Sequence, residues 1–294
     1  MEWTESLKSA INYIESHLLD NISADDVADS VHISSFYLQK GFKIMTGYTI
    51  GEYIRCRRLY LAALDVISGR DKVIDLAYKY GYETPESFTK AFSRFHGVSP
   101  LQMKGNSSKI KTFLPLKISI VIQGGNDMDY TVEKMDSFKV IGFQREFSFD
   151  NSYAEIPKFW DEIAQKYWKL GERKEGEIGR VICDCRVGEF GVCIDDIGGG
   201  KFRYMIAGTY DGGNIPEGMT VFEFPAMEWA KFRCFGPLPG SLQSVNTKIF
   251  KEWLPGNPDY SIAMGANVEW YSMEDMSSPS YESGIWLPVV RKQK

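Results

Sequence analysis

Residues 22–47 read ISADDVADSVHISSFYLQKGFKIMTG, and residues 71–100 read DKVIDLAYKYGYETPESFTKAFSRFHGVSP. Both stretches place an alanine four positions before a candidate turn residue: Ala28 before His32, and Ala77 before Gly81. A small residue lets two helices cross closely, and the turn residue must tolerate a positive φ. Glycine does so freely, and histidine is among the other residues enriched there. The sequence therefore predicts two helix-turn-helix units in series.

A single amphipathic helix is predicted between the two units. From Thr49 to Ile67 the apolar residues recur at helical spacing, for example at Ile50, Ile54 and Leu61. At ~1.5 Å per residue this helix spans roughly 28 Å. The distance is close to the ~34 Å between successive major-groove faces of B-DNA. One polypeptide can therefore place two recognition helices in adjacent major grooves.

Helix ends are also marked in the sequence. A first amphipathic helix is predicted from Thr4 to Leu18. Ser23 followed by Asp26 resembles a capping box, with the shorter aspartate in place of glutamate. Thr84 followed by Pro85 is a cap with proline at the first helical position, which predicts the start of the second recognition helix.

The charge is unevenly distributed. The net charge is −5, of which residues 1–112 contribute +1 and residues 113–294 contribute −6. DNA binding by the first half would therefore depend on local clusters of arginine and lysine rather than on bulk charge. The clusters are Arg55, Arg57 and Arg58, and Lys40 with Lys43.

Composition indicates an ordinary globular protein. Of 294 residues, 44% are hydrophobic and 25% charged, which predicts two domains with cores of their own. We find neither a charged-then-apolar leader nor a run of 18 apolar residues, and the five cysteines suit a reducing compartment. We therefore expect a cytoplasmic protein without membrane contact.

The second half changes to an alternating pattern with a weak internal repeat. Residues 132–143 (VEKMDSFKVIGF) resemble residues 221–232 (VFEFPAMEWAKF), and each stretch precedes a helix with an aromatic pair, within 157–168 and 242–254. Further strands are predicted around Phe113 to Ile122, Val181, 190–194, 204–207, 266–271 and 285–290, with turns at 124–127 and 198–200. We interpret this half as a duplicated βαββ unit forming an antiparallel sheet with helices on one side.

The first hundred residues resemble the AraC/XylS family of transcription regulators, in particular its Rob-like branch. The motifs that carry the resemblance are SSFYLQKGF (34–42), IRCRRL (54–59), IDLAYKYGY (74–82), SFTKAF (87–92) and GVSP (97–100). The resemblance implies an all-α DNA-binding domain over residues 1–106, with double-stranded DNA and RNA polymerase as partners. The positions that match DNA-contacting positions of the family are Ser34, Ser35, Phe36, Gln39, Lys40, Lys43, Arg57, Glu86, Ser87, Lys90 and Arg94.

The two recognition helices are expected to contribute unequally. Gln39 can bond adenine in a bidentate manner and Lys40 can reach guanine. Glu86, by contrast, stands where relatives carry a polar amide, and phosphates repel a carboxylate. We therefore expect the second helix to be the weaker reader, with Ser87, Lys90 and Arg94 positioning the DNA backbone.

The second half resembles the gyrase-inhibitor-like small-molecule-binding domains. The carrying motifs are FPA (224–226), WAKF (229–232), FKEWLP (250–255), VEWY (268–271) and IWLPV (285–289). The resemblance implies an α+β domain over residues 128–294, after a linker at 107–127, with a cavity of aromatic rings around one glutamate. Such a cavity binds lipophilic, often cationic, effectors. The residues that fit it are Glu269, Tyr153, Trp160, Tyr204, Trp229 and Tyr271.

Physical chemistry supports the same interpretation of Glu269. A carboxylate on an apolar surface is destabilised by desolvation unless a cation or a donor compensates it, and surrounding rings attract cations. Glu282, at the start of the last strand, is the alternative acid. Single aromatic residues are more often core packing than ligand contacts.

Other kinds of site are weakly supported. The spacing of Cys183, Cys185 and Cys193 is not that of a metal site, and we expect no metal, no cofactor and no catalytic residue. The expected function is an effector-responsive transcription regulator. The alternative is a DNA-binding protein whose second domain sequesters a ligand, or hydrolyses it with Glu269 and Tyr271.

Overall fold

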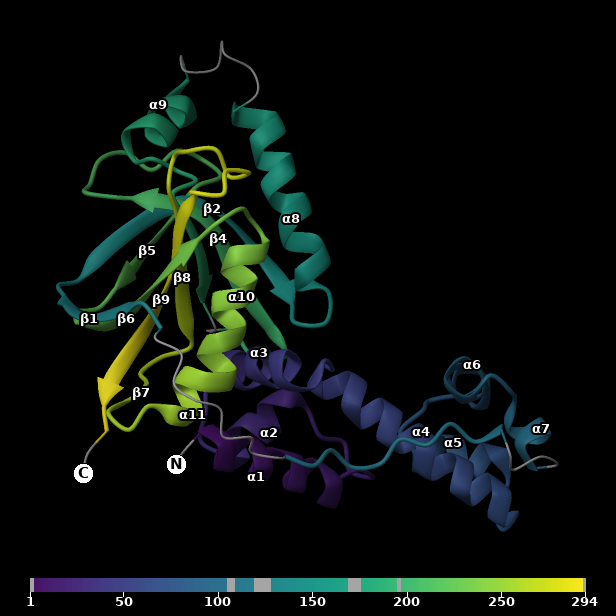
Figure 1. The fold of residues 1–294 in the computed structure, drawn as a ribbon. Coiled ribbons are helices and arrows are strands. Elements are labelled where there is room, and N and C mark those ends of the chain that lie inside the picture. The colour runs from purple at the N-terminus through teal and green to yellow at the C-terminus, as the bar shows by residue number, and fades with distance from the viewer. Residues whose placement is uncertain (1–2, 105–108, 119–127, 169–175, 195–196, 293–294) are drawn as a thin grey trace. The chain divides into compact units, whose positions relative to one another are not determined.

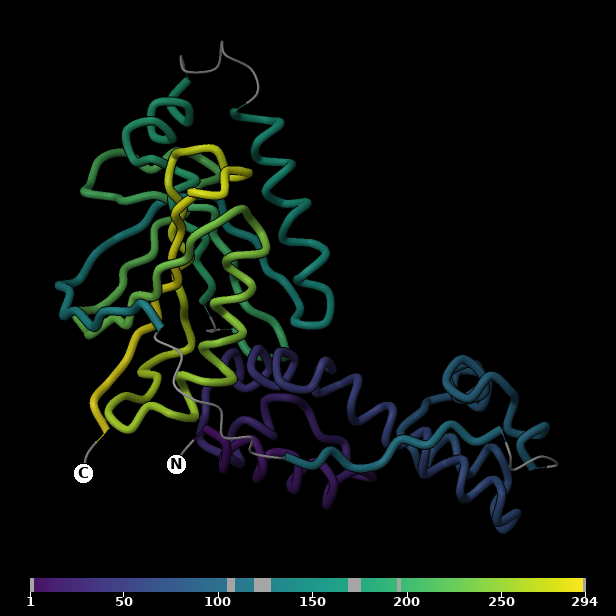
Figure 2. The backbone as a smooth tube through the Cα atoms, in the orientation of Figure 1, coloured from purple at the N-terminus to yellow at the C-terminus, as the bar shows by residue number. Residues whose placement is uncertain are grey.

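The computed structural model describes residues 3–104, 109–118, 128–168, 176–194 and 197–292. Contacts divide the chain into two compact units. The first holds residues 3–33 and the described part of 46–122; the second holds residues 34–45 and the described part of 123–294. The path of the chain through the elements of each unit can be followed in Figure 2. The sequence placed residues 34–45 in a DNA-binding domain over residues 1–106 and residues 109–118 in a linker. In the structure, residues 34–45 group with the C-terminal half and residues 109–118 group with the N-terminal helices.

The first unit is all-helical, as the sequence predicts. Its Ser23–Asp26 capping box is present, with Ser23 N–H donating to Asp26 Oδ2 at 2.7 Å. The long helix begins after a second capping box at Thr49, and the last recognition helix begins at Pro85 after a Thr84 cap. The helices of this unit are α1 (Trp3–Ser16), α2 (Ala24–Ser30), α4 (Ile50–Ser68), α5 (Val73–Lys79), α6 (Pro85–His96) and α7 (Pro100–Lys104).

Both predicted turn residues have positive φ. The φ of His32 is 56° and that of Gly81 is 80°, which confirms that each alanine is followed by a left-handed turn. Ala77 is fully buried in a core with Leu59, Phe88 and Phe92, so α5 and α6 cross closely against α4. The second helix-turn-helix unit is thus built as the sequence indicates.

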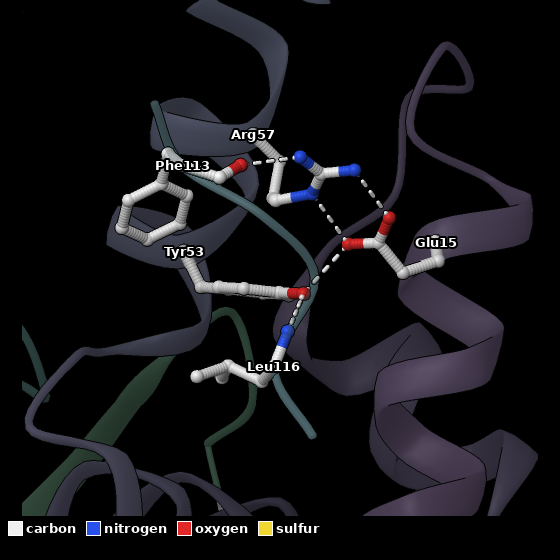
Figure 3. Close-up of polar contacts among 5 residues, drawn as sticks. All are labelled: Glu15, Tyr53, Arg57, Phe113 and Leu116. Carbon is white, nitrogen blue, oxygen red and sulfur yellow. Dashed lines mark hydrogen bonds and ion pairs between the residues drawn. The ribbon is translucent and has the colours of Figure 1, made fainter. Parts of the chain in front are cut away.

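A buried ion pair joins α1 to α4 (Figure 3). Arg57 is 5% exposed, and its Nε and Nη2 atoms each donate to the Glu15 carboxylate at 2.8 Å. The Tyr53 hydroxyl donates to the same carboxylate at 2.6 Å, and burial followed by this bond raises the pKa of Tyr53. The prediction that Arg57 contacts DNA is wrong for this structure, because its guanidinium is occupied inside the unit. Arg58 likewise donates to the backbone carbonyls of Leu18 and Asp20.

The same network holds the segment that follows α7. Arg57 Nη1 donates to the Phe113 carbonyl, and Leu116 N–H donates to the Tyr53 hydroxyl at 3.1 Å. The Phe113 ring packs against Tyr48, Tyr53 and Phe95. Residues 110–118 form no strand, so the strand expected from Phe113 is wrong over these residues. The rest of that strand, the Gly105–Ser108 linker and the Gly124–Asp127 turn lie outside the described residues.

The second unit is an antiparallel sheet built from two copies of one motif. The first copy consists of β1, β2, α8, β3 and β4, and the second of β5, β6, α10, β8 and β9. The strand order in the sheet is β1-β6-β9-β8-β3-β4-β2-β5. If each strand is replaced by its counterpart in the other copy, the same order is obtained in reverse. The first strand of each copy pairs with the second strand of the other copy, because β1 pairs with β6 and β5 pairs with β2. The predicted duplication is confirmed. The strands are β1 (Tyr130–Met135), β2 (Phe138–Ser148), β3 (Phe190–Ile194), β4 (Lys201–Thr209), β5 (Thr220–Phe224), β6 (Met227–Phe235), β7 (Tyr260–Ile262), β8 (Ala266–Tyr271) and β9 (Glu282–Arg291).

The helices of the two copies correspond to the two aromatic segments found in the sequence. The two helices, α8 and α10, are labelled in Figure 1. Each is followed by a π-helical turn, namely η2 after α8 and η4 after α10. Val181, expected in a strand, lies in α9, so Cys183 and Cys185 are at a helix end instead. The helical elements are α3 (Ser35–Thr46), α8 (Ser152–Ile163), η2 (Ala164–Trp168), α9 (Glu177–Asp184), α10 (Gly240–Lys248), η4 (Ile249–Trp253) and α11 (Leu254–Gly256).

Strand alternation gives the sheet a helix-covered face and an opposite face. On the helix-covered face Phe159 of α8 packs against Phe147, and Trp253 of η4 packs against Phe232. The opposite face forms an apolar core that includes Val192, Val268 and Trp229. Glu269 lies on the helix-covered face, because its neighbour Val268 is in the other core.

Replacing Arg57 by alanine should destabilise the first unit by about 3–5 kcal/mol, because the half-buried Glu15 carboxylate loses its cation. Urea unfolding followed by helical circular dichroism measures this loss. Arg55→Ala is the matched control, since Arg55 is exposed on the same helix and should change stability by less than about 0.5 kcal/mol. Equal effects of the two substitutions would contradict a structural role for Arg57.

Candidate effector site and DNA-binding surface

Glu269 lies in the middle strands of the sheet. β8 pairs with β3 on one side and with β9 on the other, which places Glu269 opposite Gly191 and Ile285. The Tyr271 hydroxyl, two residues along the same strand face, donates to Glu269 Oε2 at 2.7 Å. The acid is half-buried, so one donor from the protein compensates part of its lost hydration.

A chain of donors leads from α8 to this carboxylate. Trp160 Nε1 donates to the Tyr204 hydroxyl at 2.9 Å, and the hydroxyls of Tyr204 and Tyr271 are bonded to each other. The single proton of Tyr271 is directed at Glu269, so Tyr204 donates to Tyr271. The indole of Trp160 also meets the Tyr271 ring edge-on at 5.4 Å between centroids. The cluster therefore directs every donor toward the acid and surrounds it with rings.

The tyrosines of this cluster remain protonated. Burial, followed by the negative charge of Glu269, raises the pKa of Tyr204 and of Tyr271 well above the usual value. Neither hydroxyl is thus a ready base. Protonated hydroxyls beside a carboxylate and aromatic faces suit the binding of a cation better than they suit catalysis.

Gly191 makes room for this arrangement. A Cβ atom at Gly191 would lie 2.4 Å from Tyr204 Oη and 3.1 Å from Glu269 Oε2. Any side chain there would displace the hydroxyl. Gly191 was not among the residues expected at the site, although a glycine inside a strand is a sequence signal for a close approach.

The other expected effector residues divide between the two faces. Tyr153 is 57% exposed, and burial of its hydroxyl followed by the charge of Glu269 raises its pKa. Trp229 is fully buried in the opposite core against Phe138 and Phe224, so its expected role in the site is wrong. Glu282 is on that opposite side too, and lies 3.6 Å from Arg233 in an ion pair. Of these two candidate acids, Glu269 is therefore the one on the helix-covered face.

Helix α3 is packed against the same helix-covered face. The Phe36 ring packs against Phe149 and Phe202, each at 5.6 Å between centroids. The Tyr37 hydroxyl donates to the Ala266 carbonyl, and Lys40 Nζ donates to Asn267 Oδ1 at 3.3 Å. Strand alternation from Glu269 would have placed Asn267 on this face, but nothing in the sequence placed Tyr37 and Lys40 beside it.

The predicted DNA-contacting residues are consequently not equally exposed. In α3, Phe36 is 2% exposed and Gln39 is 7% exposed, while Ser35, Lys40 and Lys43 are half-buried, as is Ser34 just before the helix. In α6, Glu86, Ser87, Lys90 and Arg94 are all exposed. Helix α6, which was expected to contribute less to base recognition, is thus the one that presents its polar side chains to solvent.

The described residues hold no group of three or more His, Cys, Asp or Glu side chains that could hold a metal ion. Cys193 is buried on the helix-covered face, where burial and the charge of Glu269 raise the pKa of its thiol. Among the described helices, none is long and apolar enough to cross a bilayer.

Two family models match the chain. One, described as "Integron-associated effector binding protein", matches residues 131–289, and the other, described as "Helix-turn-helix domain", matches residues 27–106. The first covers the sheet with its helices, and the second covers most of the helices of the first unit together with α3.

Curated relatives align mainly with the first hundred residues. The regulatory protein SoxS of Salmonella typhimurium is 34% identical over 94 residues, which are 32% of this chain and 88% of SoxS. The transcriptional regulator Rob of the same species is 26% identical over 175 residues, covering 57% of each chain. The chain spans only about a third of several other relatives, such as the Bacillus subtilis regulator YbfP.

A solved structure titled SAV2435 bound to tetraphenylphosphonium is similar to 55% of this chain and 94% of its own, with a TM-score of 0.45 and 22% identity.

The close approach at Gly191 can be tested by a double-mutant cycle. Gly191→Ala should lower the free energy of unfolding by about 1–3 kcal/mol, because its Cβ would overlap the Tyr204 hydroxyl. In a Tyr204→Phe background, where that oxygen is absent, the same change should cost much less. The cycle is measured by urea unfolding, and strictly additive losses would show that Tyr204 does not lie over Gly191.

Proposed function

We propose that this chain is a transcription regulator that binds a lipophilic cation at Glu269. The chain belongs to the integron-associated effector binding protein family through residues 131–289 and to the AraC-type regulators through its helix-turn-helix region. One observation carries the proposal: a carboxylate held by Tyr271 on a face lined with Trp160 and Tyr204.

The chemistry of this cluster favours a cation over other ligands. A bound anion would be repelled by Glu269, and a neutral ligand would leave the acid without a counter-charge on a partly dehydrated surface. A cation gains Coulomb attraction to the carboxylate and attraction to the ring faces. The rings of Trp160 and Tyr271 also lie beside the acid, so apolar groups on the ligand would be favoured as well.

The DNA-binding part of the proposal rests on α6. Lys90 and Arg94 lie one turn apart and are exposed, with Ser87 near the helix start. Lysine and arginine at such positions neutralise phosphates and fix the register of the protein on the duplex. We assign α6 to backbone positioning in the major groove.

Apolar side chains on α5 support a protein partner. Ile74 and Tyr78 lie one turn apart and are 46% and 59% exposed. Exposed apolar surface beside a DNA-binding helix suits a contact with RNA polymerase, which would place the protein's action in the cytoplasm.

Glu269→Gln tests the effector site. The substitution keeps the acceptor for Tyr271 and removes the charge, so tetraphenylphosphonium, a lipophilic cation, should bind about 30-fold more weakly, equivalent to about 2 kcal/mol. Isothermal titration calorimetry measures the affinity. The melting temperature should change little.

Glu282→Gln is the matched control for this titration, because Glu282 lies on the same sheet but on its other side. It should leave cation binding unchanged. Unaltered binding to the Glu269→Gln variant, or a loss caused by Glu282→Gln, would refute the assignment.

Lys90→Ala tests the role of α6. Removing one phosphate contact should reduce the slope of log affinity against log salt by about 0.9 on mixed-sequence duplex DNA. Fluorescence anisotropy at several salt concentrations measures the slope. Lys158→Ala, an exposed lysine of α8, is the control and should leave the slope unchanged. A slope unaffected by Lys90→Ala would exclude a phosphate contact.

A further inference from the structure

The residues of α3 that are suited to reading bases are engaged with the sheet. Phe36, Gln39 and Lys40 lie along the helix surface expected to enter the major groove. Phe36 is buried against Phe149 and Phe202, and Lys40 is bonded to Asn267. A side chain cannot fill both places at once, so binding of α3 to the sheet and binding of α3 to DNA exclude each other.

The contact between α3 and the sheet is apolar at one end and imperfectly paired at the other. The rings of Phe36 and Tyr37 supply apolar contact to the rings of Phe202 and Phe250. Asn267, however, is fully buried, and its Nδ2 atom has no hydrogen-bond partner among the residues that the structure describes. A buried donor without an acceptor destabilises the state that buries it. The bound state of α3 therefore contains its own destabilising element.

This imperfect end lies next to the acid. Asn267 and Glu269 are two residues apart on β8 and point to the same face. The Cys193 thiol, opposite Asn267, is influenced by the negative charge of Glu269 and by the positive charge of Lys40. The Lys40 ammonium thus shares one electrostatic neighbourhood with the proposed effector site.

We propose that α3 exchanges between two partners, the helix-covered face of the sheet and the DNA major groove, and that a lipophilic cation at Glu269 releases α3 by repelling Lys40. The release of α3 by a cation rests on the proposed function, whereas the exchange of α3 between the sheet and DNA does not. Lys40 is bonded to Asn267, two residues from Glu269 on the same strand face, so a cation bound at Glu269 brings a second positive charge close to the Lys40 ammonium. On a partly dehydrated surface the repulsion between two such charges is larger than in water. The released Lys40 and Lys43 then become available to phosphates and bases.

Substitutions at Asn267 test the exchange from the side of the sheet, away from any residue assigned to DNA. Asn267→Leu removes both the acceptor of Lys40 and the buried Nδ2 donor. Asn267→Asp gives Lys40 a charged partner. Without cation, Asn267→Leu should bind mixed-sequence duplex DNA at least about fivefold more tightly than the native chain. Asn267→Asp should bind several-fold more weakly.

The cation arm uses the same anisotropy assay with saturating tetraphenylphosphonium. The native chain should bind DNA about tenfold more tightly, with a steeper salt slope, because the charges of α3 are added to those of α6. Circular dichroism melts of both variants establish that they are folded. Asn267→Leu should respond little to the cation, because its α3 is already free.

The possible failures are distinguishable. If calorimetry shows no binding of tetraphenylphosphonium, the proposed effector class is wrong, and the Asn267 variants still decide whether α3 binds the sheet. If the cation binds but DNA affinity and salt slope do not change, the release mechanism is wrong while the effector site stands. Asn267 variants that both shift DNA affinity in one direction, or not at all, overturn the two-partner proposal.

Discussion

The hydrogen bond from Tyr271 to Glu269 is the interaction on which the arrangement of this face depends. A carboxylate in the middle strands of a sheet is stable only if donors replace its lost water. Tyr271 supplies one donor directly, and Tyr204 and Trp160 orient it through their own bonds. Gly191 is required because the Tyr204 hydroxyl occupies the space above that strand. The helix α8 is thereby tied to the sheet at the point where the acid lies.

The duplicated fold makes this site possible without making it symmetric. Both copies contribute a central strand, β3 and β8, and both place an aromatic-rich helix with a π-helical turn on one face. β3 carries no charged residue, whereas β8 carries Glu269. Glu269 thus makes the two similar halves chemically unequal at their central strands, and α3 packs beside it at Ala266 and Asn267.

Local sequence signals predicted much of this molecule. The capping boxes, the left-handed turns at His32 and Gly81, and the duplicated strand pattern depend on neighbouring residues and were found correctly. Predictions failed where distant residues decide the outcome. The sequence around Arg57 predicts a surface cation, but in the fold its guanidinium is bonded to Glu15. Trp229 was predicted in the effector site, but the faces of the strands place it in the opposite core. The packing of α3 on the sheet joins residues more than 200 positions apart, and no pattern along the chain contains that information.

Hydrogen–deuterium exchange with and without tetraphenylphosphonium tests most directly the central claim that Glu269 and α3 share one face and that a cation at the acid frees the helix. Peptides from residues 35–46 should exchange faster when the cation is bound, while peptides from β3 and β8 exchange more slowly. Peptides from α6, residues 85–96, serve as the internal reference and should not change. Unchanged or slower exchange in residues 35–46, with the cation demonstrably bound, would contradict the account.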